Sequence, residues 1–360
     1  MKKCFALCFL FCFLATESAD AQLNSGYYNQ VSSIPTVQKN RVMPTARTSV
    51  EGIKLRQKVR CGSNLSVKSY AHQDDDGIWR GIDADLCRVI AEAILGDESK
   101  IEIVNILPSE VSHALNNNRI DVMLSGAFSA AKLEIEHQAL SVGMLYYDEQ
   151  RILARGDEIE NLADLKNKKI CITNDSDEYK NFDDYNVLNG LKIHYLTFAD
   201  RAKAKEAFLL KRCQAMTAGY LYLNGLKQEM PNLKAQILSD SIAVMPVYAF
   251  VQNDNSEFRM VLKWILNALL LAEKYNINAQ NMEFFASNDN PELRNLLGDD
   301  PHFWQSLGLR PDWVKRAVQS LGNYADIYER NLGLDSPINL DRGQAKLIKN
   351  GGSVWPLPFM

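Results

Sequence analysis

The most informative segment of this chain is Gly81-Ile-Asp-Ala-Asp-Leu-Cys-Arg-Val-Ile-Ala-Glu-Ala-Ile-Leu95. It opens with a glycine and two carboxylates, and apolar residues then recur at intervals of three and four, which predicts an amphipathic helix. The residues of its apolar side are Leu86, Val89, Ile90, Ala93 and Ile94. Short strands are predicted before it, at Val59 to Leu65, and after it, at Lys100 to Ile106. This β-turn-helix-β order is typical of α/β proteins.

The first 21 residues have the pattern of a secretory signal peptide. Lys2 and Lys3 form a charged start, Cys4 to Ala15 is apolar but too short to span a bilayer, and Ala19-Asp-Ala21 offers a cleavage site. A membrane anchor is the alternative, and the short apolar run disfavours it. We therefore expect a product that is exported to the periplasm through signal peptide 1–21.

The formal net charge is −4, and the basic residues are scattered along the chain. A nucleic-acid partner is not expected from such a distribution. Four cysteines remain after the signal: Cys61, Cys87, Cys171 and Cys213. An even number in an exported chain favours disulfides, and four cysteines allow three connectivities. No CxxC spacing occurs, so no metal site is predicted.

Residues 22–57 are rich in Ser, Asn, Gln and Thr and predict a flexible leader, with a docking role as the alternative. Strands and helices then alternate up to Met144, and a second alternating unit begins near Glu149. Two apolar runs, Tyr146 to Ala154 and Ala243 to Gln252, bracket the second unit and are predicted to be crossing strands of a hinge. The expected organisation is a discontinuous lobe 1 of residues 58–148 and 246–360, and a lobe 2 of residues 149–245.

Beyond the second crossing, apolar residues from Phe258 to Leu270 predict an amphipathic helix that packs in the core. The tail from Pro301 is rich in aromatic residues. Asn323, Glu329 and Arg330 in this tail are interpreted as a polar network that fixes a C-terminal helical extension to lobe 1; a catalytic role is the alternative.

Almost the whole chain from Val59 to Pro356 resembles the type II periplasmic solute-binding proteins, in particular the general L-amino-acid binding subgroup of the polar amino-acid family. The matching stretches are Arg60-Cys-Gly-Ser-Asn64, Gly77 to Cys87, Tyr146-Tyr-Asp148, Arg212-Cys213, Gly322 to Pro337 and Arg342-Gly343. The resemblance implies a two-lobe α/β clamshell with a C-terminal helical extension. It also implies disulfides within the lobes, Cys61–Cys87 and Cys171–Cys213, because that subgroup has cysteines at these positions.

In that family an arginine of lobe 1 binds the ligand carboxylate, an acid of lobe 2 binds its ammonium, and backbone N–H groups at a helix N-terminus assist. This sequence departs from the pattern at all three points. Leu133 occupies the arginine position, with Lys132 beside it. The anion loop of lobe 2 reads Asn174-Asp-Ser-Asp177, and Gly219 replaces the expected aspartate.

Of the residues that hold the ligand in that family, this sequence retains five. They are Tyr70 as an aromatic lid, Asp83 and Asp85 beside the cleft, and Ser125 and Gly126 as backbone donors. The full set of candidate ligand-binding residues is Tyr70, Asp83, Asp85, Ser125, Gly126, Lys132, Arg151, Asn174, Ser176 and Gly219.

Two positions leave alternatives open. Arg151 on the first crossing strand is predicted either to fill space or face solvent, or to supply the missing cation. Asp175 and Asp177 are predicted either to cap a helix or to form a cation site.

The function that the resemblance implies is that of a monomeric receptor for an ABC importer. Its partners would be a small polar ligand, an amino acid or a derivative of one, and a membrane permease; no cofactor and no metal are expected. The alternative is a repurposed scaffold that has lost amino-acid binding and acts as an interaction or structural protein of the envelope. An enzyme is not expected, because no recognisable nucleophile pair is present.

Overall fold

The computed structural model describes residues 48–127, 130–136, 139–285 and 289–359. The predicted signal peptide 1–21 and most of the predicted leader 22–57 lie outside these residues. In the described part of the chain, no helix is both long and apolar enough to cross a membrane.

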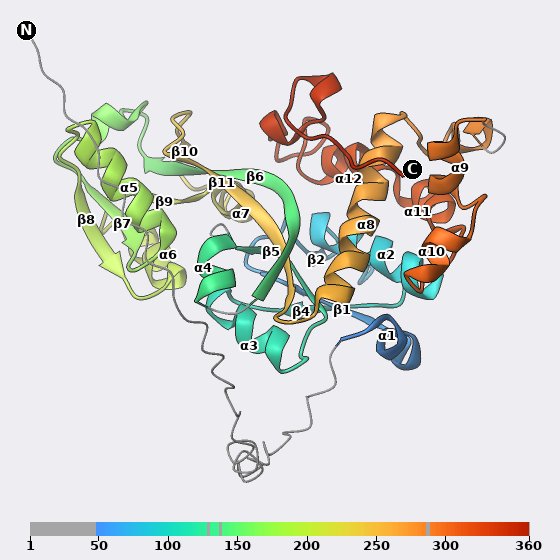
Figure 1. Cartoon of the computed structure of the whole chain (residues 1–360). Helices are drawn as coiled ribbons and strands as arrows, with labels where there is room; N and C mark the ends of the chain where they lie inside the picture. Colours follow the sequence, from blue (N-terminus) through green and yellow to red (C-terminus); the bar gives the residue numbers. More distant parts are fainter. Residues whose placement is uncertain (1–47, 128–129, 137–138, 286–288, 360) are drawn as a thin grey trace, which may run out of the picture. The chain divides into compact units, whose positions relative to one another are not determined.

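A single mixed sheet runs through the described structure in the order β4-β1-β5-β11-β6-β9-β7-β8, and β10 pairs with β6 (Figure 1). Strands β4, β1 and β5 are parallel to one another, and so are β9, β7 and β8. We call the first three strands, with the helices packed on them, half 1, and the last three, with their helices, half 2. The remaining pair, β2 and β3, forms a separate ribbon.

The strands have these bounds: β1 Val59–Ser63, β2 His72–Gln73, β3 Trp79–Arg80, β4 Ile101–Asn105, β5 Val122–Ala127, β6 Ala139–Arg155, β7 Lys169–Thr173, β8 His194–Phe198, β9 Ala215–Gly219, β10 Ala235–Ile237 and β11 Ala243–Gln252. The α-helices are α1 Val50–Arg56, α2 Ile82–Leu95, α3 Val111–Asn116, α4 Ala130–Ile135, α5 Asp177–Leu188, α6 Arg201–Leu209, α7 Tyr220–Glu229, α8 Ser256–Lys274, α9 Pro291–Leu297, α10 His302–Ser306, α11 Trp313–Leu321 and α12 Tyr324–Asn331.

The two predicted crossing strands are β6 and β11, which lie side by side between the halves. They pair antiparallel from Ala243 opposite Gln150 to Gln252 opposite Ala139. At its far end β6 also pairs with β9 of half 2, and β11 pairs with β5 of half 1. These two strands therefore connect the halves directly.

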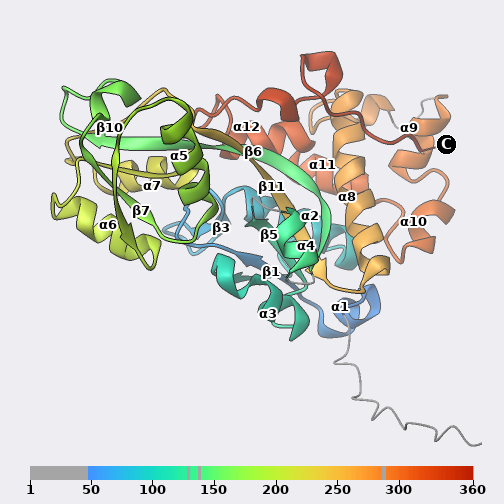
Figure 2. The same cartoon turned by 60° about the vertical axis from the view of Figure 1, so that its left-hand side comes forward.

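Helices cover both faces of each half of the sheet. In half 1, α2 and α8 contribute to one apolar cluster, and α3 to another on the opposite face. In half 2, α6 and α7 pack on one face, and Phe182 of α5 belongs to a cluster on the other. Both views show α5 and α6 beside the strands of half 2, whereas α9 to α11 lie on the far side of half 1 (Figures 1 and 2).

Each half contains one disulfide. Cys61 on β1 is bonded to Cys87 on α2, and Cys171 on β7 is bonded to Cys213, which lies two residues before β9. Both are the pairs that the resemblance implied. A disulfide restricts the unfolded chain, so each one stabilises the half that contains it.

The C-terminal extension is helical, as expected, and it packs on half 1. Arg330 on α12 donates to Asp85 on α2 at 2.7 Å, and Asn323 donates to the carbonyl of Ile277 at 2.9 Å. Arg342 forms a buried pair with Glu273 on α8 at 2.9 Å. A catalytic role is not needed to explain these tail residues, because their polar groups hold the extension in place.

Two local predictions are corrected by the structure. The leader ends earlier than residue 57, because Ser49 caps helix α1 and Ile53 is completely buried against the core. The N-cap of α5 is Ser176, whose oxygen accepts from the backbone N–H of Tyr179; Asp175 precedes the cap and Asp177 begins the helix. Ser176 rather than an aspartate caps this helix, because its short side chain reaches the free N–H groups of the first turn.

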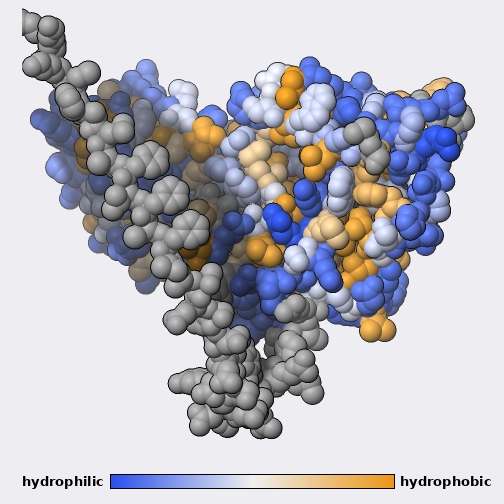
Figure 3. Space-filling view, viewed as in Figure 1, coloured by the Kyte–Doolittle hydropathy of each residue, from blue (hydrophilic) through white to orange (hydrophobic). Residues whose placement is uncertain are grey.

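The face of the molecule in Figure 3 is largely hydrophilic in the described residues, with hydrophobic residues scattered among hydrophilic ones. Scattered apolar residues of this kind are normal on a protein surface.

Candidate functional site

The turn that begins α2 places Tyr70 beside Asp83. Gly81 has φ 109°, and a Cβ at this position would lie 2.4 Å from the carbonyl oxygen of Tyr70. That same oxygen accepts from the backbone N–H of Asp83 at 2.9 Å. Only glycine permits both the backbone conformation and the close approach.

A network of hydrogen bonds lines the half 1 side of the site. The two oxygens of the Asp83 carboxyl accept from the hydroxyls of Ser63 at 2.6 Å and Ser125 at 2.5 Å. The oxygen of Ser125 also lies 2.6 Å from the hydroxyl of Tyr146. No cation within the described residues forms an ion pair with Asp83. We call these four residues the half 1 wall.

Burial dominates the electrostatics of this wall. It raises the pKa of Asp83 to about 7, against the lowering effect of the serine hydroxyls. It also raises the pKa of Tyr70 and of Tyr146 well above the ordinary value for a phenol. Burial disfavours each charged form because the interior solvates charge poorly. The wall is therefore a buried network of hydroxyl groups around one partly protonated carboxyl.

Ser125 ends this network in an unusual backbone conformation. It has φ 46°, a left-handed value that is uncommon for residues other than glycine, and it is almost completely buried. Strained conformations persist where surrounding contacts hold them, and they concentrate at functional sites. The hydrogen bonds to Asp83 and Tyr146 are such contacts.

Asp148 lies on β6, between the halves. Its Oδ1 accepts from the backbone N–H of Glu149 at 2.8 Å and from that of Leu221, in the first turn of α7, at 3.3 Å. Burial raises the pKa of Asp148 to about 7, although these N–H groups and Arg201 oppose the shift. Its Oδ2 lies 2.3 Å from the point at which a Cβ on Gly219 would stand.

Half 2 contributes a charged wall. Arg201, the first residue of α6, forms an ion pair with Glu178 in the first turn of α5. The guanidinium also lies over the ring of Tyr222, 4.9 Å from its centroid. We call these three residues the half 2 wall. Arg201 lowers the pKa of Tyr70 and of Asp148 against the effect of burial, so its charge acts on both.

The residues that sequence reasoning missed as site residues are Tyr146, Asp148, Glu178, Arg201 and Tyr222. One signal for Arg201 was available: it follows the carboxyl end of a predicted parallel strand, where ligands bind in open α/β sheets. No comparable signal marks Glu178 or Tyr222, because they come from helices far apart in sequence.

The structure brings Tyr70, Asp83 and Ser125 of the predicted set together. It turns Asp85 to the other side of α2, where Arg88, Arg330 and Asn331 donate to its carboxylate. Asp85 thus joins α2 to the C-terminal extension.

The predicted residues of the anion loop have local partners. Asn174 donates from its side chain to Asp175 at 2.8 Å, and Ser176 caps α5 and donates to the carbonyl of Thr173. Both residues follow β7, at the same end of the sheet as Gly219.

Arg151 is also engaged locally. Its guanidinium binds Glu149 on the same strand at 2.6 Å and lies 4.6 Å from the centroid of the Tyr220 ring. This arrangement satisfies the charge without a ligand.

The arginine position of the resemblance is apolar in the structure as well. Leu133 on α4 is buried in a cluster with Ile106 and Val111. Gly126 lies on β5 and Lys132 on α4, where the structure describes only the backbone.

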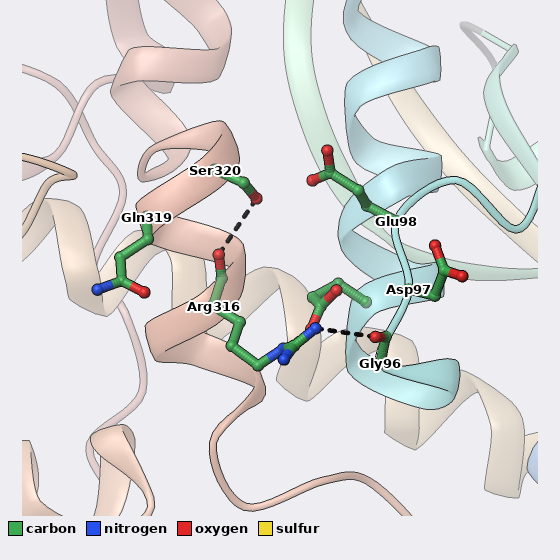
Figure 4. A pocket seen from close by; sticks show the side chains of 7 residues that line it. Gly96, Asp97, Glu98, Arg316, Gln319 and Ser320 are labelled. Carbon is green, nitrogen blue, oxygen red and sulfur yellow. Dashed lines mark hydrogen bonds and ion pairs between the residues drawn. The ribbon is translucent and has the colours of Figure 1, made fainter.

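The structure also has two surface hollows. The first lies apart from these walls, whereas the second adjoins them, because its lining includes Asp177, next to Glu178, and Met245, which pairs with Asp148 across β6 and β11. One is bounded by the end of α2 and by α11, where Arg316 donates to the carbonyl of Gly96 at 2.9 Å and forms an ion pair with Glu92 (Figure 4). The other lies between α5 and β11, beside Lys180 and Pro246. The first is a helix–helix contact whose arginine is already paired, so we do not regard it as the binding site.

Comparison with known proteins gives one family. Residues 59–297 match the bacterial extracellular solute-binding proteins, family 3. The putative amino-acid ABC transporter-binding protein YhdW of Escherichia coli K12 is 28% identical over 316 residues, which are 87% of this chain and 93% of that protein. The glutamate/glutamine/aspartate/asparagine-binding protein BztA of Rhodobacter capsulatus is 28% identical over 315 residues, which are 87% of this chain and 93% of BztA.

A solved structure has the same fold over most of the chain. It is an ABC transporter periplasmic binding protein from Brucella ovis with glutathione bound, with a TM-score of 0.79 and 29% sequence identity, covering 87% of this chain and 99% of that one. This similarity confirms the expected type II periplasmic binding-protein fold. Together the comparisons favour the transport receptor over the envelope scaffold.

Proposed function

Because the chain belongs to the bacterial extracellular solute-binding proteins, family 3, we propose that it is the periplasmic receptor of an amino-acid ABC importer. The family is described as solute-binding, and a binding role rather than catalysis is proposed for this chain. The ligand is an amino acid or a small derivative of one, held between half 1 and half 2. The protein acts as a monomer and delivers its ligand to a membrane permease.

The observation that carries this proposal is the convergence of polar side chains from both halves. Tyr70 and the half 1 wall come from one side, Asp148 from the strand between the halves, and the half 2 wall from the other. All of them lie at or just beyond the carboxyl ends of parallel strands or on β6 beside them, which is the usual place for a ligand in an open α/β sheet. A ligand in this position would contact both halves.

A ligand that contacts both halves would cause them to close around it. In this proposal the halves are the two lobes predicted from sequence, and β6 and β11 are the hinge between them. A ligand that binds both lobes favours the closed form by the free energy of the contacts that exist only there.

The class of ligand is supported by the relatives. One is named for glutamate, glutamine, aspartate and asparagine, another is named as a general L-amino acid-binding periplasmic protein, AapJ of Rhizobium johnstonii, and the solved structure has glutathione bound. These molecules share a free α-ammonium and a free α-carboxylate. We propose that the ligand of this chain carries both groups.

The test is binding to the secreted protein, purified without denaturation. Native mass spectrometry identifies what co-purifies, and thermal unfolding is then followed with the twenty L-amino acids and with glutathione. A ligand at about 100 times its Kd is expected to stabilise the protein by about 2.7 kcal/mol, which raises Tm by several degrees. No co-purified ligand and no shift with any of these compounds would overturn the proposal and favour the scaffold.

A further inference from the structure

We propose that two residues outside the ligand-binding set that the resemblance implies receive the charged ends of the ligand: Asp148 binds its ammonium group, and Arg201 binds its carboxylate. This inference rests on the proposed function and names the residues that perform it. It replaces the acid missing at Gly219 and the arginine missing at Leu133 by groups from other elements.

The carboxylate of Asp148 stands where the missing acid is expected. Its Oδ2 lies 2.3 Å from the position of a Cβ on Gly219, a distance at which two side chains cannot coexist without movement. Gly219 and Gln150 face each other across the β6–β9 pair, so Asp148 reaches this space from the neighbouring strand. The loss of a side chain at 219 therefore leaves room that another acid fills.

One oxygen of Asp148 remains available. Its Oδ1 is used by the backbone N–H groups of Glu149 and Leu221. Its Oδ2 accepts no hydrogen bond from any residue in the described part of the chain. A carboxylate held through one oxygen can accept from an ammonium group with the other. Asp148 is 1% exposed and burial raises its pKa to about 7, so an ammonium group that donates to Oδ2 would also favour the ionised form of this buried side chain.

Arg201 likewise has some hydrogen-bond donors in use and others without a partner among the described residues. Its Nη2 donates to Glu178, and its guanidinium lies over Tyr222. Its Nε and Nη1 have no partner among the described residues, and 26% of the side chain is exposed. Arginine binds carboxylates through two parallel N–H donors, and a side chain already oriented by an acid and a ring loses less freedom in doing so.

Neither Arg151 nor the residue at the family's arginine position, Leu133, is as well placed. The guanidinium of Arg151 is bound to Glu149 and covered by Tyr220. Leu133 offers no charge and packs in an apolar cluster. Arg151 uses both Nε and Nη2 on Glu149, whereas Arg201 uses only Nη2 on Glu178 and keeps the Nε and Nη1 donors for a ligand.

The arrangement predicts how the ligand lies. The ammonium and the carboxylate of the ligand are both bound by residues of β6 and half 2. Half 1 contributes Tyr70 and the hydroxyl groups behind it. A ligand therefore needs a free ammonium and a free carboxylate close together, whereas its side chain is contacted by less charged surroundings. Blocking either group removes one of the two ionic contacts.

The experiment compares variants by isothermal titration calorimetry. The probes are the twenty L-amino acids and glutathione, and the tightest binder is then compared with its α-carboxamide and its N-acetyl derivative. Arg201→Gln is expected to weaken binding of the free amino acid about 100-fold, and Asp148→Asn by a similar factor, because each removes a charge-assisted contact. Arg212→Gln serves as the control: this arginine is also in half 2 and lies over Phe198, at 5.9 Å, but it is away from the walls, so a change below about threefold is expected.

The analogues separate a ligand contact from a structural role. Wild-type protein should reject the α-carboxamide, and Arg201→Gln should lose most of that discrimination while it keeps the discrimination against the N-acetyl derivative. Asp148→Asn should show the reverse. Arg201→Lys keeps the charge without the planar pair of donors and should give an intermediate loss, which also covers a failure of the glutamine variant to fold.

The outcomes distinguish the two proposals. If the wild-type protein binds none of the probes, the proposed function fails, and this inference fails with it. If it binds one of them and Arg201→Gln or Asp148→Asn binds it equally well, or with unchanged discrimination against the analogues, only this inference is overturned.

Discussion

The two walls of the site differ in how their charges are treated. The half 1 wall holds a buried carboxyl, Asp83, whose oxygens are occupied by serine hydroxyls and which has no ion-pair partner among the described residues. The half 2 wall holds an arginine that is paired with an acid and keeps donors open. The half 1 wall is suited to maintain a fixed local structure, and the half 2 wall is suited to bind a charged group of the ligand.

The physical basis of this difference is the balance between burial and pairing. A carboxyl without a cation becomes easier to protonate when it is buried, so Asp83 is only partly ionised near neutral pH. Arg201 remains charged because Glu178 compensates for its partial burial.

The largest effect is expected from Gly81→Ala in half 1. A Cβ there meets the backbone of Tyr70 at 2.4 Å, in a conformation with φ 109° that alanine rarely adopts. We expect a loss of about 4 kcal/mol in the free energy of unfolding, measured by urea titration. Gly77→Ala is the matched control, since it has positive φ but no atom within 4 Å, and it should cost about 1 kcal/mol. Equal losses in the two variants would contradict a tight turn at Gly81.

Removal of the disulfides compares the halves directly. The bonds Cys61–Cys87 and Cys171–Cys213 close loops with sequence separations of 26 and 42. The loop-entropy relation predicts losses of about 3.5 and about 4 kcal/mol for the double alanine variants. Calorimetry should show the two losses to be similar. A loss confined to one variant would indicate that the other half is held by packing alone.

Asp83→Asn tests whether the half 1 wall is neutral. The pKa of Asp83 is about 7 in the folded protein and near the ordinary 3.8 when unfolded, so the folded state binds more protons between these values. The contribution of this group to stability is therefore full below about pH 4 and is lost as the pH rises through 7. Asparagine does not ionise, so the variant avoids this loss of stability at high pH. We expect its free energy of unfolding to exceed that of the wild type by on the order of 2 kcal/mol at pH 8 and to differ little at pH 4.

Urea titrations of both proteins at the two pH values measure this effect. A variant that is less stable than wild type at pH 8 would show that the ionised form of Asp83 is stabilised by the wall.

The smallest effect is expected where half 2 touches the C-terminal extension. The hydroxyl of Tyr220 donates to the carbonyl of Ile338 at 2.8 Å. Tyr220→Phe keeps the ring that covers Arg151 and removes this bond, at a cost of about 1 kcal/mol. Glu229→Gln is the control: its exposed pairs with Lys68 and Lys205, at 3.8 and 3.6 Å, are worth at most about 0.5 kcal/mol each. A larger loss in the control would mean that the surface charges couple the halves.

Much of the fold was predictable from local patterns. The helix from Ile82 to Leu95 and the strands on both sides of it follow from apolar periodicity, and α8 follows from the same signal. Helix α1 was missed because its seven residues follow a polar stretch and only Val50 and Ile53 are buried. Helix α5 was recognised only as a cap region, since its apolar side is narrow.

The site was predicted less completely. Tyr70, Asp83 and Ser125 belong to a continuous motif or follow a predicted strand, so a sequence comparison reaches them. Asp148 and Arg201 became visible as neighbours only when strands and helices separated by about fifty residues were brought together. Sequence comparison registers the absence of a side chain at Gly219, but it does not show which other side chain occupies the space.

The α/β class, the family resemblance and the absence of the usual charged residues at 133 and 219 can all be recognised from the amino-acid sequence. These properties reside in local periodicity and in residue identity at single positions, which need no coordinates. Which side chains surround the site can be recognised only in the folded protein. Desolvation, ion pairing and open hydrogen-bond donors depend on distances between elements that are remote in the chain, and those distances exist only in the folded protein.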